Sequence, residues 1–144
     1  MNIMIKRLTQ TAKVPTRGSV AAAGVDLYAD SDKDVIVRPG ETVMIGTGIA
    51  MEIPDGYFAG LFARSGLASK QGLRPANCVG VIDSDYRGEI RIAVHNDSAI
   101  AQTIKGDERI AQCVIMPYLS ETMIETDALS DTERGTGGFG STGA

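Results

Sequence analysis

The C-terminal stretch 134–143, RGTGGFGSTG, carries the residue types that hold a phosphate chain. Its glycines expose backbone N–H groups, and these groups together with hydroxyl side chains and a guanidinium can cradle phosphate oxygens. An aromatic ring in the same stretch offers a face on which a base can stack. We therefore interpret the stretch as a mobile lid over a bound nucleotide, formed by Arg134, Phe139, Ser141 and Thr142.

The same glycines also match the spacing G-x-G-x-x-G at Gly135, Gly137 and Gly140. A dinucleotide-binding loop needs a helix after it and an acidic residue about twenty positions further on, and the chain ends too soon for either. A Walker loop is excluded because its lysine is missing. The remaining alternative is a flexible terminus without function, but such a terminus has no need of Arg134 or Phe139.

Arg64, Ser65 and Gly66 form a second candidate anion site, directly after the apolar run 57–62. This step places a guanidinium, a hydroxyl and an accessible backbone N–H side by side. A helical turn after it would add the positive end of its dipole. The plain alternative is an arginine in an ordinary surface ion pair, which contributes little to stability.

Asp83 is the candidate for activating water. The segment 77–88 and the alternating run 89–95 predict a β-hairpin with a polar turn. Asp83 directly follows Val81 and Ile82, which we expect to be buried, and a carboxylate at the mouth of an apolar pocket can take a proton from water. In the same turn, the ring of Tyr86 could form the floor of a sugar pocket.

The elements that must position these residues have a period of two. Ile90, Ile92 and Val94 alternate with polar residues, which is typical of a half-buried strand. Glycine and proline separate the short apolar runs, and the one short helix that we expect covers residues 66–70. The pattern predicts a single all-β domain, either a sandwich, a barrel or a jelly roll. Further strands are expected at Ile3 and Ile5, 35–37, 43–53, 57–62 and 110–116.

Composition excludes several classes of function. The net charge of −4 and the isoelectric point near 4.9 argue against nucleic-acid binding, which needs a basic surface. No apolar stretch is long enough for a membrane span, and the N-terminus has no signal peptide, so we expect a cytoplasmic protein. Cys78 and Cys113 are expected to be buried thiols, and with His95 as the one histidine a zinc site is not expected.

Five segments resemble, in order, the five motifs of the trimeric dUTPase family (dUTP pyrophosphatases). They are residues 22–28, 63–68, 77–88, 109–114 and 134–143. The resemblance implies a jelly-roll or β-barrel-like domain at 1–133 and a flexible glycine-rich arm at 134–144 that closes over the active site. It also implies a homotrimer with shared active sites. The implied reaction is hydrolysis of dUTP to dUMP and pyrophosphate, which limits uracil in DNA and supplies dUMP for dTMP synthesis.

The resemblance also implies which residues hold the phosphates and the metal. Asp26 matches an acidic residue that supports a Mg²⁺ ion through water. The positions that match phosphate contacts, with the arm residues on the γ-phosphate, are Arg64, Ser65, Gly66, Gln112, Arg134, Ser141 and Thr142.

The base, the sugar and the attacking water are assigned to the hairpin in the same way. Asp83 matches the aspartate that activates water, and Tyr86 matches the ring that leaves no room for a 2′-hydroxyl. Phe139 would stack on uracil from the arm. The positions that match the remaining uracil and deoxyribose contacts are Asn77, Gly80, Val81, Ile82 and Arg91.

Three other functions stay open at this point. A dCTP deaminase has a related fold but needs a glutamate for attack on the ring, and Glu89 is the best candidate. A regulatory module gated by dUTP would keep the same binding residues. A purely structural jelly roll would need neither the arm nor the Arg-Ser-Gly step.

Overall fold

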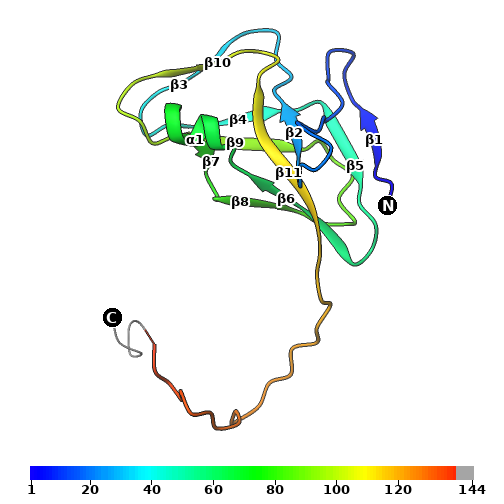
Figure 1. The fold of residues 1–144 in the computed structure, drawn as a ribbon, viewed down its shortest axis with the longest axis vertical. Helices are drawn as coiled ribbons and strands as arrows, with labels where there is room; N and C mark the ends of the chain where they lie inside the picture. The colour runs from blue at the N-terminus through cyan, green and yellow to red at the C-terminus, as the bar shows by residue number, and fades with distance from the viewer. Residues whose placement is uncertain (139–144) are drawn as a thin grey trace.

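The computed structural model describes residues 1–138, and Figure 1 shows that the β-strands form one body. Within these residues there are eleven strands and one short helix, which confirms the all-β prediction. The elements are β1 (Met4–Arg7), β2 (Val25–Tyr28), β3 (Val35–Val37), β4 (Thr42–Gly46), β5 (Ile49–Glu52), β6 (Tyr57–Phe62), α1 (Ser65–Gln71), β7 (Leu73–Pro75), β8 (Val79–Ile82), β9 (Arg91–Asn96), β10 (Gln102–Ile104) and β11 (Arg109–Pro117).

The strands form two larger and two smaller antiparallel sheets in the described part of the chain. The four-stranded sheet has the order β2-β11-β6-β8, and the three-stranded sheet has the order β4-β9-β7. The two small sheets pair β1 with β5 and β10 with β3. Neighbours in a sheet are mostly distant in sequence, which is the connectivity of a jelly-roll-like fold.

The core lies between the sheets and follows the alternation read from the sequence. Ile90, Ile92 and Val94 are buried, whereas Arg91 between them is exposed. The two strands that flank β11 add Leu27 and Leu61 to the same core cluster. The period of two in the sequence therefore reports correctly which face of β9 points inward.

The apolar run 43–53 divides into two strands at a corner. β4 ends at Gly46 and joins β9, while β5 begins at Ile49 and joins β1. Gly48 has a φ of +62°, and a side chain there would collide with Asp30. The buried hydroxyl of Thr47 donates to the carbonyl oxygen of Ile90 at 2.7 Å and satisfies its own hydrogen bond.

The expected helix is present and slightly longer than predicted. α1 begins after Arg64, whose extended backbone (φ −81°, ψ 131°) makes it the N-cap. Gly72 ends the helix with a φ of 68°, and its N–H donates to the carbonyl of Ala68. Leu67 anchors the helix in the core.

The predicted hairpin between residues 77 and 95 is wrong in its pairing. β8 pairs with β6, whereas β9 pairs with β4 and β7, so the turn between β8 and β9 crosses from one sheet to the other. β8 is the edge strand of its sheet, and Val81 is 58% exposed instead of buried. Gly80, the next residue toward the core, packs on Leu61.

The two cysteines differ in environment, which corrects the expectation that both are buried. Cys113 is 2% exposed, and burial raises the pKa of its thiol to about 11. Cys78 is exposed and has a φ of 61°, because it lies in the turn that precedes the edge strand β8.

Beyond β11 the chain leaves the body as an extended segment, coloured orange to red in Figure 1. Residues 118–136 are all exposed. The exposed side chains include apolar ones such as Tyr118, Leu119 and Met123. No helix among residues 1–138 has the length and apolar character needed to cross a bilayer.

The difference between the cysteines predicts that one thiol per folded chain reacts with a chromogenic disulfide reagent at pH 8. Cys113 should not react, because its raised pKa keeps the thiol protonated at that pH and burial excludes the reagent. Unfolding in guanidinium chloride should release the second thiol. Cys78→Ser should abolish the native reaction, and a native Cys78→Ser protein that still reacts would contradict the assignment.

Candidate active site

Two adjoining cavities lie where β8, the following turn and β9 face the side chain of Met44 on β4. One has a volume of about 280 Å³ and the other about 150 Å³. Both are lined by Val81, Ile82 and Arg91. The larger cavity adds Asp83, Tyr86 and Glu89, and the smaller adds Asn77, Gly80, Leu61, Pro75, Ile92 and Ala93. The crossing between the sheets therefore gathers the base and sugar residues predicted between positions 77 and 91 in one place.

The turn after β8 is held by hydrogen bonds at both ends of Tyr86. Its backbone N–H donates to the carbonyl of Asp83 at 3.2 Å, and its hydroxyl donates to the carbonyl of Glu89 at 3.0 Å. The ring covers Gly88, where any side chain would collide with it. This arrangement fixes the ring and leaves the carboxylate of Asp83 exposed at the cavity.

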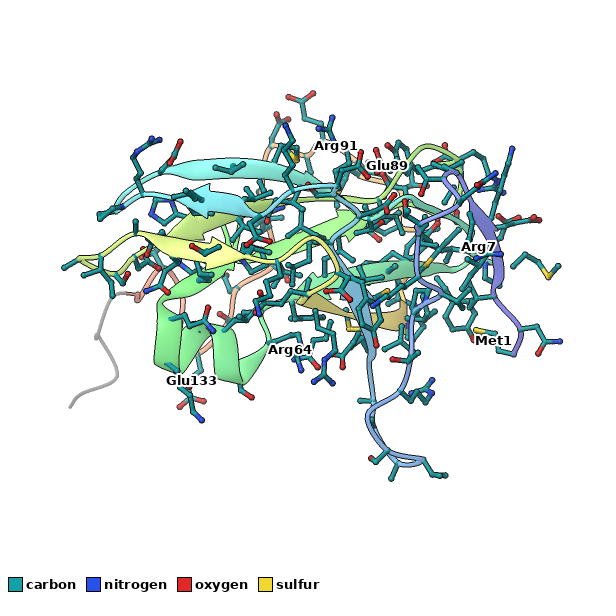
Figure 2. The ribbon with its side chains drawn as sticks, turned by 90° about the horizontal axis from the view of Figure 1, so that it is seen from above. Met1, Arg7, Arg64, Glu89, Arg91 and Glu133 are labelled. Atoms are coloured by element: carbon teal, nitrogen blue, oxygen red, sulfur yellow. The ribbon has the colours of Figure 1, made fainter. Side chains whose placement is uncertain are left out.

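A second group of charged residues surrounds Asp26 on β2. Arg64 Nε donates to Asp26 Oδ1 at 2.8 Å, and Arg109 Nη1 donates to Asp26 Oδ2 at 3.2 Å. The Asp26 side chain is only 14% exposed. Figure 2 shows Arg64 on the far side of the body from Glu89 and Arg91. One carboxylate thus orients two guanidinium groups, one from the residue before α1 and the other from the first residue of β11.

Gln112 fixes the backbone beside this group. It lies on β11 opposite both Asp26 and Phe62, and its Nε2 donates to the carbonyl of Ala63 at 2.9 Å. This bond holds the exit from β6 just before Arg64. Ser65 and Gly66 follow as exposed residues in the first turn of α1.

The predicted site residues therefore fall into separate groups within one chain. Among the residues that the structure describes, the phosphate candidates around Arg64 do not line the cavities beside Asp83. Arg134 lies on the extended C-terminal segment, where its Nε donates to the carbonyl of Gly137 at 2.8 Å. The expectations for Phe139, Ser141 and Thr142 fall outside the described residues.

A family model described as dUTPase matches residues 10–143 of this chain. The chain belongs to the dUTPase family. It is 52% identical over 143 residues to the deoxyuridine 5'-triphosphate nucleotidohydrolase of Nautilia profundicola, with 99% of each chain covered. It is 49% identical to the protein of the same name from Desulfitobacterium hafniense, with 99% of this chain and 95% of that one covered.

Solved dUTPase structures share the fold. The dUTPase of Staphylococcus bacteriophage 80alpha with dUpNHpp has a TM-score of 0.85 and 30% identity, with 99% of both chains covered. A variant of the dUTPase from phage phi11 of S. aureus, described as coordinating a structural Mg(II) ion, has a TM-score of 0.81 and 25% identity. That comparison covers 91% of this chain and 100% of the phage chain.

The resemblance to dUTPases gave no role to three residues that lie in or beside these groups. Met44 and Glu89 line the larger cavity, and Arg109 shares the carboxylate of Asp26. Met44 occupies an outward position in the alternating pattern of β4, which indicates an exposed side chain. No neighbouring residue in the sequence indicates that this side chain faces β8. The contact between Arg109 and Asp26 joins positions 83 residues apart.

The geometry around Asp26 predicts a stability effect. Asp26→Asn leaves two guanidinium groups facing each other without a charged partner, and should lower the free energy of unfolding by about 1–3 kcal/mol. Urea denaturation at one fixed protein concentration measures the change. Asp107→Asn is the control, because its ion pair with Lys13 is exposed, and it should leave that free energy unchanged. Equal stability of the two variants would contradict the role given to Asp26.

Proposed function

We propose that this protein hydrolyses dUTP to dUMP and pyrophosphate. The observation that carries the proposal is the cavity at the β8–β9 crossing, which gathers Asp83, Tyr86 and Arg91 beside the edge of β8. Membership of the dUTPase family and relatives named for this reaction support the same activity. The substrate would be a deoxyuridine nucleotide, and the product dUMP would feed dTMP synthesis while uracil is kept out of DNA.

The edge strand β8 would read the base. An edge strand presents backbone N–H and C=O groups that no neighbouring strand occupies, and these groups have fixed geometry. A base with a mismatched edge would leave buried polar groups unpaired, which costs about 1–3 kcal/mol for each group. Asn77, Gly80, Val81 and Ile82 line the cavity from this side, so uracil would be recognised mostly through the backbone.

Tyr86 would select the sugar. Its hydroxyl is held by the carbonyl of Glu89, and its ring closes over Gly88, so the ring cannot move away without breaking a hydrogen bond. A fixed ring packed under deoxyribose excludes the additional hydroxyl of a ribonucleotide. Arg91, which lines the same cavity, would contact the nucleotide from β9.

Asp83 would act as the general base. Its carboxylate would take a proton from a water molecule as that water adds to the α-phosphorus, and the bond to the pyrophosphate oxygen breaks in the same displacement. Holding the water and the phosphate in line accounts for much of the rate in such reactions. The turn that ends at Tyr86 supports this role because it fixes the backbone of Asp83.

The second group of residues would bind the triphosphate. Arg64 uses Nε for Asp26 and Nη1 for the carbonyl of Arg109, which orients the guanidinium for phosphate contacts. Ser65, Gly66 and Gln112 would complete this set. From the arm 134–144, Arg134, Ser141 and Thr142 would hold the γ-phosphate, and Phe139 would stack on uracil, while residues 1–133 would form the β domain.

Magnesium would be held mainly by the substrate. The described residues contain no cluster of three or more potential metal ligands, and both oxygens of Asp26 already accept hydrogen bonds from arginines. A carboxylate keeps further lone pairs for water, and Mg²⁺ retains several waters when it binds phosphates. Asp26 thus fits an indirect role through water. The ion would neutralise charge that develops on the phosphate oxygens.

A complete site would need more than one copy of the chain. The Asp83 cavity and the Asp26–Arg64 group are separate in one chain, and residues 118–138 extend away from the body. We propose that a homotrimer joins the β8–β9 cavity of one subunit to the phosphate residues and the arm of others. We also propose a cytoplasmic location, which the two free cysteines support because thiols persist in reducing compartments.

The structure disfavours the candidate acid/base of the dCTP deaminase alternative. Glu89 lines the cavity, but its Oε1 accepts the N–H of Gly48 at 2.9 Å. One oxygen of this carboxylate is engaged in holding the backbone, which disfavours Glu89 as the group that moves protons at a ring. A regulatory role is a property of phage dUTPases, which control transfer of virulence genes.

Pyrophosphate release from dUTP, UTP, dCTP and dTTP tests the proposed function. We expect turnover of dUTP at least about a hundredfold above the others, because cytosine would leave polar groups unpaired, the ribose of UTP would meet the ring of Tyr86, and the methyl group of thymine would collide with apolar atoms of the base site. A chelator should lower the rate. Ammonia release from dCTP would favour the deaminase, and tight dUTP binding without product would favour the regulatory module.

Asp83→Asn tests the general base. The amide is nearly isosteric but cannot take the proton, so kcat should fall about 10²–10⁴-fold while binding of a non-hydrolysable dUTP analogue is retained. Asp85→Asn changes the same charge in the same turn and should keep nearly normal turnover, since Asp85 is exposed and does not line the described cavity. A normal rate for Asp83→Asn would exclude this residue as the base.

A further inference from the structure

Glu89 is a carboxylate in a cavity where the ligand would be a polyanion. It lines the cavity together with Asp83, Tyr86 and Arg91. A second negative charge in such a place repels a polyanion. Its presence therefore indicates that the side chain has another task. Its contacts, which come from three directions, show what that task is.

The first contact ties Glu89 to the corner between β4 and β5. Its Oε1 accepts the N–H of Gly48 at 2.9 Å. The carboxylate also lies directly over Gly46, where any side chain would collide with it. A charged acceptor on a backbone N–H forms one of the stronger hydrogen bonds in a protein. The side chain is 34% exposed and is therefore held at the surface of the cavity.

The other two contacts lead to the walls of the sugar site. The hydroxyl of Tyr86 donates to the main-chain oxygen of Glu89 at 3.0 Å. Glu89 Oε2 lies 3.9 Å from Arg91 Nε, and Figure 2 shows the two side chains next to each other on the same edge of the body. One residue therefore connects Tyr86, Arg91 and the corner between β4 and β5.

We propose that Glu89 is a positioning residue that sets the spacing between Tyr86 and Arg91 and thereby determines selectivity for deoxyribose. The inference rests on the proposed function. Exclusion of a 2′-hydroxyl requires a ring that cannot retreat, and the ring of Tyr86 is held through the backbone of Glu89. The side chain of the same residue is in turn bound to the N–H of Gly48, which anchors Glu89 to the corner between β4 and β5. Loosening this chain of contacts opens space for ribose and changes kcat/KM for UTP more than kcat/KM for dUTP.

The test compares kcat/KM for dUTP and UTP in Glu89→Ala, Glu89→Gln and wild type. Loss of both side-chain contacts in Glu89→Ala should lower the dUTP/UTP ratio about tenfold, mostly through a lower KM for UTP. Glu89→Gln keeps an acceptor for Gly48 N–H and should retain most of the ratio. Thermal melting checks that each variant is folded.

Glu41 supplies a matched control. Its Oε2 accepts the N–H of Arg38 at 2.8 Å and lies 3.8 Å from Arg38 Nη1, so it makes the same two kinds of contact as Glu89. It does not line the described cavities beside Asp83. Glu41→Ala should leave the dUTP/UTP ratio unchanged.

Tyr86→Phe keeps the proposal testable if Glu89→Ala does not fold. It removes only the hydroxyl that bonds to Glu89 and should lower the ratio in the same direction. A folded Glu89→Ala protein with an unchanged ratio, or an unchanged ratio in Tyr86→Phe, would overturn the inference. Absence of dUTP turnover in the wild type would instead overturn the proposed function, and the inference with it.

Discussion

The joint between the β4–β5 corner and the start of β9 is the constraint on which the rest of the molecule depends. Thr47 donates through its hydroxyl and its N–H to the carbonyl of Ile90, and the N–H of Ile90 donates to the carbonyl of Ile49. Glu89 adds its carboxylate to the N–H of Gly48. These bonds are largely buried, where unpaired polar groups are costly, so the corner and the crossing strand can only form together.

This joint explains why the candidate site lies at a boundary between sheets. A turn within one hairpin would pack on its own strands and expose little concave surface. Here the chain leaves the edge of the four-stranded sheet and enters the three-stranded one, which opens a cavity between β8 and β9. The edge strand then offers backbone groups to a ligand, while β6 and β11 behind it supply a rigid support.

A local group of arginines would suit the proposed triphosphate ligand although the protein as a whole is acidic. The chain has a net charge of −4, but Arg64 and Arg109 converge on a single carboxylate at β2. Asp26 adds one negative charge to this group and fixes the orientation of two positively charged side chains. Arginine suits such a place, because its planar donors can contact a carboxylate and a phosphate oxygen at once.

The sequence by itself determined the class of the fold, the short helix after Arg64 and membership of the dUTPase family. These properties depend on local alternation and on motifs whose residues are neighbours in the chain. Tertiary structure decided the sheet that each strand joins, and with it the exposure of Val81 and Cys78. It also decided the contacts of Asp26 with Arg109 and of Glu89 with Gly48, which are 83 and 41 residues apart. Alternation indicates which face of a strand is apolar but not which strand lies beside it, because pairing depends on backbone hydrogen bonds that every residue type except proline can form in full.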